Sequence, residues 1–367
     1  MKNQLSVCDI CGRNHERSNL VIIDTVAVCP ECMETHTSVC ESCGRRYIAD
    51  NMSYSPYCPT CYDSIFTQCS RCGETIRRDE ACYGPEDCES ESPYCGNCMD
   101  DLTLLIHGYY YKPEPIFYGS GKRFFGCELE IDGGGELGEH AELIMEKANS
   151  SNEHIYAKHD GSLDDGFEIV SHPMSLKYHI YKMPWESIMQ QSISLGYRSH
   201  QACTCGLHIH VNKDSLGGDS DEIDATIGRI LYFIEHNWNE LLKFSRRTPG
   251  QLTRWANRYG IYDTPKNTYE RAKSANAGRY TALNIENENT IEFRMFRGTL
   301  NHSTFIATLQ LVDEICNAAF LLSDETFEAM SWSDFVSNID ESKEELIGYL
   351  KRKRLYVNEA ESQEEEI

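Results

Sequence analysis

Residues 125–131 have the sequence FGCELEI, in which apolar and polar side chains alternate. A period of two is typical of a β-strand with one buried face, and it places Glu128 and Glu130 together on the opposite face. Further segments of this kind are Gly166–Ser171 (GFEIVS), Leu207–Val211 (LHIHV), Thr281–Ile285 (TALNI) and Thr290–Phe296 (TIEFRMF). We expect these segments to be strands of one sheet.

Between the strands, the spacing of apolar residues predicts helices. The predicted helices are Glu139–Ala148, Ser175–Leu195 with an interruption at Pro184, Asp221–Phe244, Ser303–Leu322 and Ser331–Tyr356. Because strands and helices are interleaved and the strands alternate, an α+β domain with one covered sheet face is expected.

Composition shifts along the chain predict its division into domains. We expect cysteine-rich modules over 1–100, a connector over 101–123, a main domain over 124–325 and a C-terminal helical extension over 326–367. The connector prediction rests on Asp100–Phe117, which holds three consecutive tyrosines and two prolines. The extension is expected to end in a solvated acidic tail, Asn358–Ile367.

The predicted strands carry charged side chains at positions that share a face. Glu168 lies in GFEIVS, His208 and His210 are two residues apart, and Glu292 and Arg294 repeat that spacing, with Arg297 just beyond. One such pair would be typical of an exposed strand face. Several strands with carboxylate, imidazole or guanidinium groups indicate a face lined for divalent cations and polyphosphate.

Cysteine placement predicts metal-binding modules at the N-terminus. Of 18 cysteines, 14 lie in the first 98 residues. Twelve form six CxxC pairs, which are Cys8/Cys11, Cys29/Cys32, Cys40/Cys43, Cys58/Cys61, Cys69/Cys72 and Cys95/Cys98. Glycine follows the first, third and fifth pairs, and two intervals of seven residues separate the modules, so this is a threefold repeat. Two CxxC pairs supply four thiolates to one tetrahedral zinc, which predicts three structural zinc sites in zinc-ribbon or treble-clef-like modules.

Other cysteines leave alternatives open. Cys82 and Cys88 could replace one pair of the third module or could be spare thiols, and spare thiols are favoured. Cys203 and Cys205 form a CxC pair before the HxH strand, where core or loop thiols are favoured over metal ligands. A redox role for the six pairs does not explain their regularity.

Charge excludes some classes of partner. The chain has 34 basic and 58 acidic residues and a net charge of −24, which argues against nucleic acid and anionic membranes. Residues 1–100 hold 8 basic and 16 acidic residues, so protein docking or a purely structural role is expected there. No stretch comes near the ~20 apolar residues of a membrane span, and the N-terminus lacks the apolar run of a signal peptide. A cytoplasmic protein is expected.

Four segments, in order FGCELEI, KHDGSLDDGFEIVSHP, CGLHIHVN and YTALNIENENTIEFRMFRGTL, resemble the amidoligase branch of the ATP-dependent carboxylate–amine ligases. These enzymes are relatives of glutamine synthetase and glutamate–cysteine ligase. The resemblance covers residues 124–322 and not the cysteine modules. It implies a curved antiparallel sheet with covering helices, whose concave face holds metal ions and ATP.

The resemblance also implies roles for individual residues. Glu128, Glu130, Glu168 and Glu292 would be Mg²⁺ (or Mn²⁺) ligands, and one of His208 and His210 would contact metal or phosphate. Arg294 and Arg279 would stabilise the transferred phosphoryl group, and Arg297 is grouped with the cofactor-binding residues. Asp160, in the DGSL segment, would line the acceptor site.

The implied reaction is ATP-dependent amide or isopeptide formation through an acyl phosphate, for which the protein supplies no nucleophile. The substrates would be a carboxylate and an amine, and the cysteine modules favour a peptide or protein. Two alternatives remain: a metal-dependent hydrolase that uses the HxH pair with glutamates, and a non-catalytic adaptor with a degenerate ligase fold. Nucleotide dependence distinguishes the ligase from the hydrolase.

Overall fold

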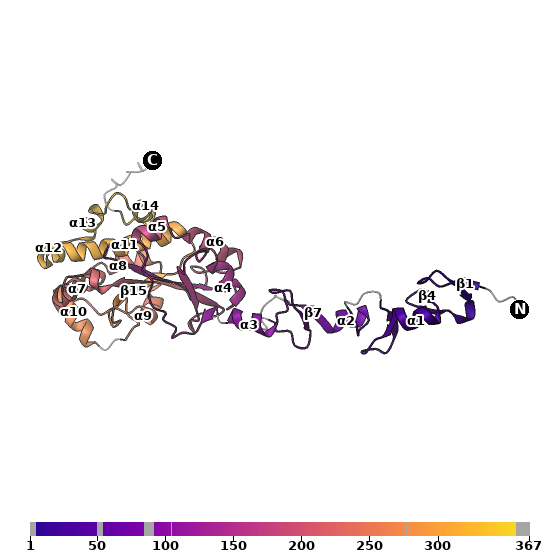
Figure 1. Cartoon of the computed structure of the whole chain (residues 1–367). Helices are drawn as coiled ribbons and strands as arrows, with labels where there is room; N and C mark the ends of the chain where they lie inside the picture. Colours follow the sequence, from indigo (N-terminus) through magenta and orange to yellow (C-terminus); the bar gives the residue numbers. More distant parts are fainter. Residues whose placement is uncertain (1–4, 50–53, 84–91, 104, 276–277, 357–367) are drawn as a thin grey trace, which may run out of the picture. The chain divides into compact units, whose positions relative to one another are not determined.

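The computed structural model describes residues 5–49, 54–83, 92–103, 105–275 and 278–356 (Figure 1). The chain divides into two compact units, Met1–Asp101 and Leu102–Ile367. The acidic tail predicted at Asn358–Ile367 lies outside the described residues, as does Cys88.

The first unit repeats a short hairpin followed by a helix. Its elements are β1 (Leu5–Val7), β2 (Asn14–Glu16), a 3-10 turn (Arg17–Asn19), β3 (Val21–Ile23), β4 (Val26–Val28), α1 (Pro30–His36), β5 (Thr37–Val39), β6 (Arg46–Ile48), α2 (Pro59–Ile65), β7 (Phe66–Gln68), β8 (Thr75–Arg77) and α3 (Gly96–Thr103). In each repeat the first CxxC pair lies between two paired strands, and the second pair lies at the start of a helix. Small hairpins of this size bury little apolar surface, so modules of this kind usually depend on a metal or on cross-links for stability.

The second unit is built on a sheet of seven strands. They are β9 (Ile106–His107), β10 (Phe125–Asp132), β11 (Ile155–Lys158), β12 (Gly166–Ser171), β13 (Gly206–Asn212), β14 (Leu283–Asn284) and β15 (Thr290–Arg297). Their spatial order is β14-β15-β13-β10-β12-β11-β9. All neighbours are antiparallel except β9, which pairs parallel to β11.

The expectation of a purely antiparallel sheet is therefore wrong at one edge, because the sheet is mixed. The parallel strand β9 comes from the segment 101–123 that was predicted as a connector. Two residues of strand are too short to give an alternating pattern, so nothing in the sequence indicated it. The predicted strands at β10, β12, β13, β14 and β15 are confirmed, and β11 was missed.

One face of the sheet is apolar. On β10, Phe125, Cys127, Leu129 and Ile131 are at most 1% exposed, and corresponding residues of β12, β13 and β15 are also buried. The helices α5 (Leu176–Tyr181), α6 (Trp185–Ser194) and α11 (His302–Leu321) lie along one side of the sheet (Figure 1). Trp185 and Phe305 lie in this layer, with ring centroids 4.5 Å apart.

The other helices follow the prediction with local breaks. The interruption expected at Pro184 separates α5 from α6, and the helix predicted over Asp221–Phe244 is broken at Asn237. The remaining helices are α4 (Gly138–Met145), α7 (Ser220–His236), α8 (Trp238–Ser245), α9 (Pro249–Trp255), α10 (Pro265–Ser274), α12 (Asp324–Ala329), α13 (Trp332–Ser337) and α14 (Glu344–Arg352), with a 3-10 turn at Lys213–Ser215. The helix expected over Ser331–Tyr356 is thus two short helices, α13 and α14.

The prediction that no stretch comes near the length of a membrane span is wrong for helix α11. By length and composition alone it is apolar enough to cross a membrane. In the structure 67% of this apolar stretch is buried within the domain, which is also typical of a core helix. Its high apolar content thus has a packing explanation in this fold.

Candidate active site

The opposite face of the sheet carries the charged residues. Register pairs bring them together across strands, because Glu128 lies opposite His208, Glu130 opposite Glu168, and His210 opposite Glu292. The four glutamates predicted as metal ligands and both histidines therefore share one face. They form the base of a cavity of about 830 Å³, and we call this set of six residues the floor.

Within the floor, carboxylate and imidazole atoms lie within contact distance. Nδ1 of His208 is 3.1 Å from Oε2 of Glu128, and Nε2 of His210 is 3.2 Å from Oε1 of the same glutamate. Nδ1 of His208 is also 3.7 Å from Oε1 of Glu292. One histidine and two glutamates, Glu128, His210 and Glu292, have ligand atoms close enough together to share a cation.

A second group of possible ligands contains only carboxylates. Glu130, Asp160 and Glu168 have oxygens within 4.8 Å of one another, and both glutamates are only 3% exposed. Asp160, which was predicted to line the acceptor site, comes from the loop after β11 and lies beside two of the predicted metal ligands. Oε2 of Glu168 is buried without a hydrogen-bond partner, with Nζ of Lys158 at 3.7 Å. A hard divalent cation fits such a set of oxygens.

The charges of the floor are strongly interdependent. Burial, the charge of Glu128 and a hydrogen bond with Asp160 raise the pKa of Glu168 to about 11. Burial also raises the pKa of Glu130, despite the nearby His208 and the Gly206 N–H. Burial alone would raise the pKa of Glu128 too, but His210 and His208 hold it well below its usual range. The carboxylates therefore repel one another unless protons, imidazolium groups or a cation lie between them.

Glycine at position 206 lets His208, Glu130 and Arg247 approach one another closely. A Cβ there would lie 2.8 Å from Nε2 of His208 and 3.4 Å from Oε2 of Glu130, and it would also contact the guanidinium of Arg247. The backbone N–H of Gly206 donates to Glu130. A side chain would thus separate the three groups.

Arginines line the same cavity. Arg294 donates to Glu292, and Arg279 donates to the hydroxyl of Tyr280 at 2.8 Å. Both lie among the cavity residues, as does Arg247, whose Nε donates to the carbonyl of Phe296 at 3.2 Å. Three guanidinium groups facing a carboxylate-rich floor suit phosphoryl oxygens held by metal ions.

Arg297 does not point to this cavity. Its guanidinium donates to Sγ of Cys203 at 3.4 Å and lies 3.5 Å from the carbonyl of Arg246. A bulge in the β13–β15 pairing between Leu207 and Ile209 shifts the register before this position. Arg297 was grouped with Glu292 and Arg294 because it follows them closely in sequence, and it is not among the residues that line the cavity.

Several cavity residues were not predicted from the sequence. They are Tyr109, Tyr110, Lys112, Lys158, His159, Arg247, Trp255, Tyr280, Asn284 and Asn287. Asn284 and Asn287 donate to Oε2 of Glu292 at 2.9 and 3.3 Å. Asn284 lies on a predicted strand, so its position offered a signal. Arg247 lies after a helix, and no spacing links it to the sheet.

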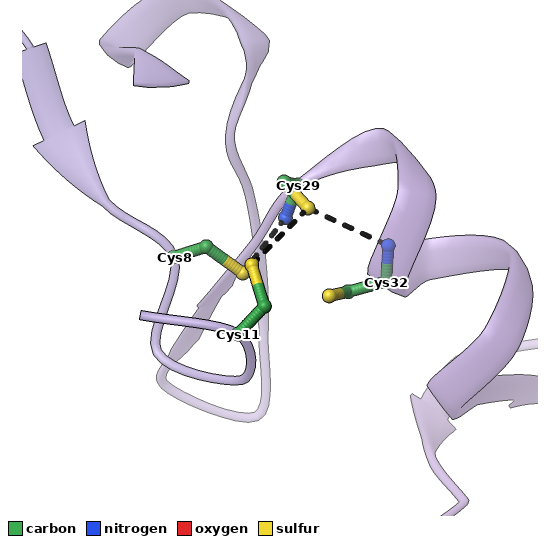
Figure 2. A group of neighbouring side chains, drawn as sticks. All are labelled: Cys8, Cys11, Cys29 and Cys32. Carbon is green, nitrogen blue, oxygen red and sulfur yellow. Dashed lines mark hydrogen bonds between the residues drawn. The ribbon is translucent and has the colours of Figure 1, made fainter. Parts of the chain in front are cut away.

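The cysteine modules form three separate groups of four. Each CxxC pair joins the predicted partner pair, and all four sulfurs of a group lie within 4.8 Å of one another. Figure 2 shows the first group, in which Cys8, Cys11, Cys29 and Cys32 converge from a turn and a helix start. In every group one sulfur pair between the two CxxC pairs is 3.9 Å apart. Tetrahedral zinc with Zn–S bonds of about 2.3 Å requires about 3.8 Å, so the groups fit zinc.

The backbone around the thiols supports metal binding. The glycines after the first pair, Gly12, Gly44 and Gly73, have φ between +70° and +73°. Each donates its N–H to the carbonyl of the first cysteine at 2.9 Å, which closes the turn. Burial would raise the pKa of Cys8, but the backbone N–H groups of Cys11 and Cys29 lower it to about 6. Burial and the neighbouring cysteines raise the pKa of Cys32 to about 12, so Cys8 ionises readily and a cation would be needed to stabilise a thiolate at Cys32.

The remaining cysteines lie outside these groups. Cys82 pairs through its backbone with Tyr94 and is not part of the third group, as the spare-thiol interpretation expects. Cys205 is buried and Cys203 is exposed. Among the described residues, neither belongs to a candidate metal group.

The fold and the floor define an α+β domain with a cavity lined by carboxylate, imidazole and guanidinium groups, preceded by three four-cysteine modules. Comparison with known families identifies the domain: residues 143–316 match the family described as "Putative amidoligase enzyme". The chain therefore carries a domain of the amidoligase family, which indicates an amide-bond-forming ligase. The matched segment contains Asp160, Glu168, the HxH pair and Glu292, whereas β10 precedes it. No curated protein matches the chain.

Proposed function

We propose that this protein is an ATP- and Mg²⁺-dependent carboxylate–amine ligase that forms an amide or isopeptide bond through an acyl phosphate. The observation that carries the proposal is the buried meeting of Glu130, Asp160 and Glu168 in a cavity lined by arginines. Buried carboxylates that face one another are costly without a cation. Arginines beside them suit a polyphosphate and are not needed by a simple hydrolytic metal centre.

The floor residues would hold divalent cations. Glu128, His210 and Glu292 are suited to one ion, and Glu130, Asp160 and Glu168 to another. When bound, Mg²⁺ would offset the charge of the triphosphate and of these carboxylates. We also propose that the sheet is curved as in glutamine synthetase. A concave polar face would let ligands from several strands reach the same ions.

The roles of the other residues follow from their positions. Arg294 is held beside Glu292 and is aimed into the cavity, so it would bind phosphoryl oxygens. Arg247 would stabilise charge near Glu130, because Gly206 lets its guanidinium approach. Positioning and charge neutralisation by these groups would let a substrate carboxylate attack the γ-phosphate in line. The amine would then displace phosphate from the acyl phosphate.

The cysteine modules are proposed to recruit a peptide or protein substrate. Their surfaces expose aliphatic side chains, which are Leu5, Val7, Val21, Ile22 and Val39, each at least 46% exposed. Exposed aliphatic residues suit contact with protein, and the acidic balance of this region does not suit nucleic acid. The proposed location is the cytoplasm, whose reducing conditions keep such thiols available for zinc.

A zinc hydrolase is the competing function. Each candidate cation group of the described floor contains no more than one histidine, and carboxylate oxygens dominate both. Such ligands favour Mg²⁺ or Mn²⁺ over zinc.

The test of the proposed ligase is thermal unfolding of the full chain with Mg²⁺ and ATP added singly and together. The ligase is expected to gain stability from the combination beyond the sum of the single additions. No stabilisation at millimolar concentrations would contradict the proposal.

A further inference from the structure

The segment that follows β9 lies against the candidate active site. Tyr109, Tyr110 and Lys112 are among the residues that line the cavity. We call Gly108–Lys112 the roof segment. It precedes the matched family segment by more than thirty residues, and it begins ten residues after Cys98 in the chain.

The ring of Tyr109 contacts two cations that come from opposite sides of the cavity. Nζ of Lys158, on β11, lies 5.6 Å from its centroid, and Cζ of Arg279, four residues before β14, lies 5.3 Å from it. Strands β11 and β14 are five places apart in the sheet order, which is about 24 Å in a flat sheet. The ring contacts both cations because the long side chain of Lys158 and the loop that carries Arg279 both extend over the polar face.

Both cations connect the ring to the floor. Lys158 is buried and lies 3.7 Å from Glu168. Arg279 stacks over Tyr280 at 4.9 Å, and the same ring receives Arg294 at 5.8 Å. Tyr109 therefore lies over the carboxylates and arginines, and not on a remote surface of the domain.

The roof segment is fixed on one side by other contacts. His107 pairs with Lys158 in the strand register, and the N–H of His159 donates to the carbonyl of His107 at 2.8 Å. The rings of His107 and Tyr111 are stacked at 3.6 Å, and the N–H of Tyr111 donates to the carbonyl of Gly108 at 2.9 Å. On the β14 side, the described contact is the one between Tyr109 and Arg279. We call this contact between the Tyr109 ring and the Arg279 guanidinium the latch.

We propose that Tyr109 is a specificity-determining residue, whose ring is latched on Arg279 and which a substrate must pass beneath or displace to reach the floor. Such a roof favours a reacting group on a slender, flexible segment, such as a side chain or a chain terminus, over a group on a folded surface. The inference rests on the proposed function for the identity of the substrate. The roof itself is testable without nucleotide.

The first test is amide hydrogen exchange of the full chain, resolved to single residues. Tyr109→Ala removes the ring from both Lys158 and Arg279 and should speed exchange of the Tyr111 amide at least about twofold, because each lost cation–π contact contributes about that factor or more. The His159 amide should stay within about twofold, because the strand pairing anchors that side. Arg279→Gln should give the same pattern from the other partner. Tyr109→Phe keeps the ring and should behave as wild type.

An unchanged Tyr111 amide in both latch variants would overturn the proposal. Equal acceleration of the Tyr111 and His159 amides would also overturn it, because the ring would then be part of general strand stability.

The second test measures access to the floor with diethyl pyrocarbonate, a small reagent for imidazoles. Tyr109→Ala should speed modification of His210 at least about threefold, which is within the effect of losing the ring's two cation contacts. The exposed His36 serves as the internal reference for reagent activity. If His210 reacts at the wild-type rate, the ring does not limit access and the proposal is wrong. If both tests give the expected results but Mg²⁺ and ATP do not stabilise the protein, the role of Tyr109 stands and the ligase proposal fails.

Discussion

Glu130 and Glu168 lie directly opposite each other on adjacent antiparallel strands, and both side chains are 3% exposed. Like charges in this arrangement destabilise a sheet. The fold accommodates them because the raised pKa of both groups favours protonation when no cation is present. This carboxylate pair is costly for folding and faces a cavity. A cation-binding role would explain why the fold contains it.

Glu168→Gln should separate stability from metal binding. Because the pKa of Glu168 is about 11 without metal, its carboxyl is neutral near pH 7 and the amide replaces it closely. The free energy of unfolding in EDTA should change by less than about 1 kcal/mol. Affinity for Mn²⁺ should fall by about 100-fold, since a neutral amide replaces an anionic carboxylate ligand. Glu325→Gln, at an exposed position on α12, is the matched control. Unchanged Mn²⁺ affinity in Glu168→Gln would show that this carboxylate is no ligand.

Arg294 and Arg297 provide a matched pair on one strand. Arg294→Gln should weaken binding of Mg²⁺·ATP by about tenfold to 100-fold, which corresponds to one lost charged hydrogen bond. Arg297→Gln should change it by less than about twofold, because its guanidinium contacts Cys203 outside the cavity. Equilibrium binding of a fluorescent ATP analogue measures both variants. Equal losses in the two variants would contradict the placement of Arg297.

The cysteine groups predict metal content. Full-length protein should carry three zinc ions, and Cys8→Ser should carry two because the group of Cys8, Cys11, Cys29 and Cys32 loses one ligand. Cys82→Ser should keep all three, since Cys82 is outside the third group. Metal analysis by mass spectrometry counts the ions. A loss of zinc in Cys82→Ser would mean that the third site uses other ligands.

Acid stability should depend on His179. Its Nδ1 accepts the indole N–H of Trp185 at 3.1 Å, so its Nε2–H donates to the carbonyl of Phe125 at 3.0 Å. Burial lowers its pKa from 6.5 to about 4, and only the neutral ring fits these contacts. The unfolded state then binds a proton that the folded state excludes. Stability is therefore complete above pH 6.5 and falls as the pH drops toward 4, by up to about 3 kcal/mol.

Urea unfolding at pH 7 and pH 4.5 measures this dependence. His179→Gln should be less stable at pH 7 but should lose less stability between the two pH values. His302→Gln, at a partly exposed position at the start of α11, should retain the wild-type dependence. An unchanged pH dependence in His179→Gln would assign the acid loss to other groups.

The sequence predicts the central strands of the sheet well and the strands near its edges poorly. Alternation at β10, β12, β13 and β15 predicted which side chains share the floor, because a strand fixes every second residue on one face. Arg247 and Tyr109 could not be predicted this way, since each reaches the cavity from a loop through tertiary packing. Arg297 was grouped with the floor only because it follows Arg294 closely in sequence, which does not determine the face on which a side chain lies. The cysteine groups needed only local spacing, and all three formed as predicted.

The central claim is that the floor and its arginines catalyse ATP-dependent amide formation. Mass spectrometry of cell extract incubated with the full-length protein, Mg²⁺ and ATP tests it most directly. We predict new species whose mass is that of two extract components minus one water, together with ADP, and neither with Glu292→Gln. Products that form equally well without ATP, or that correspond to addition of water, would contradict the ligase and support a hydrolase.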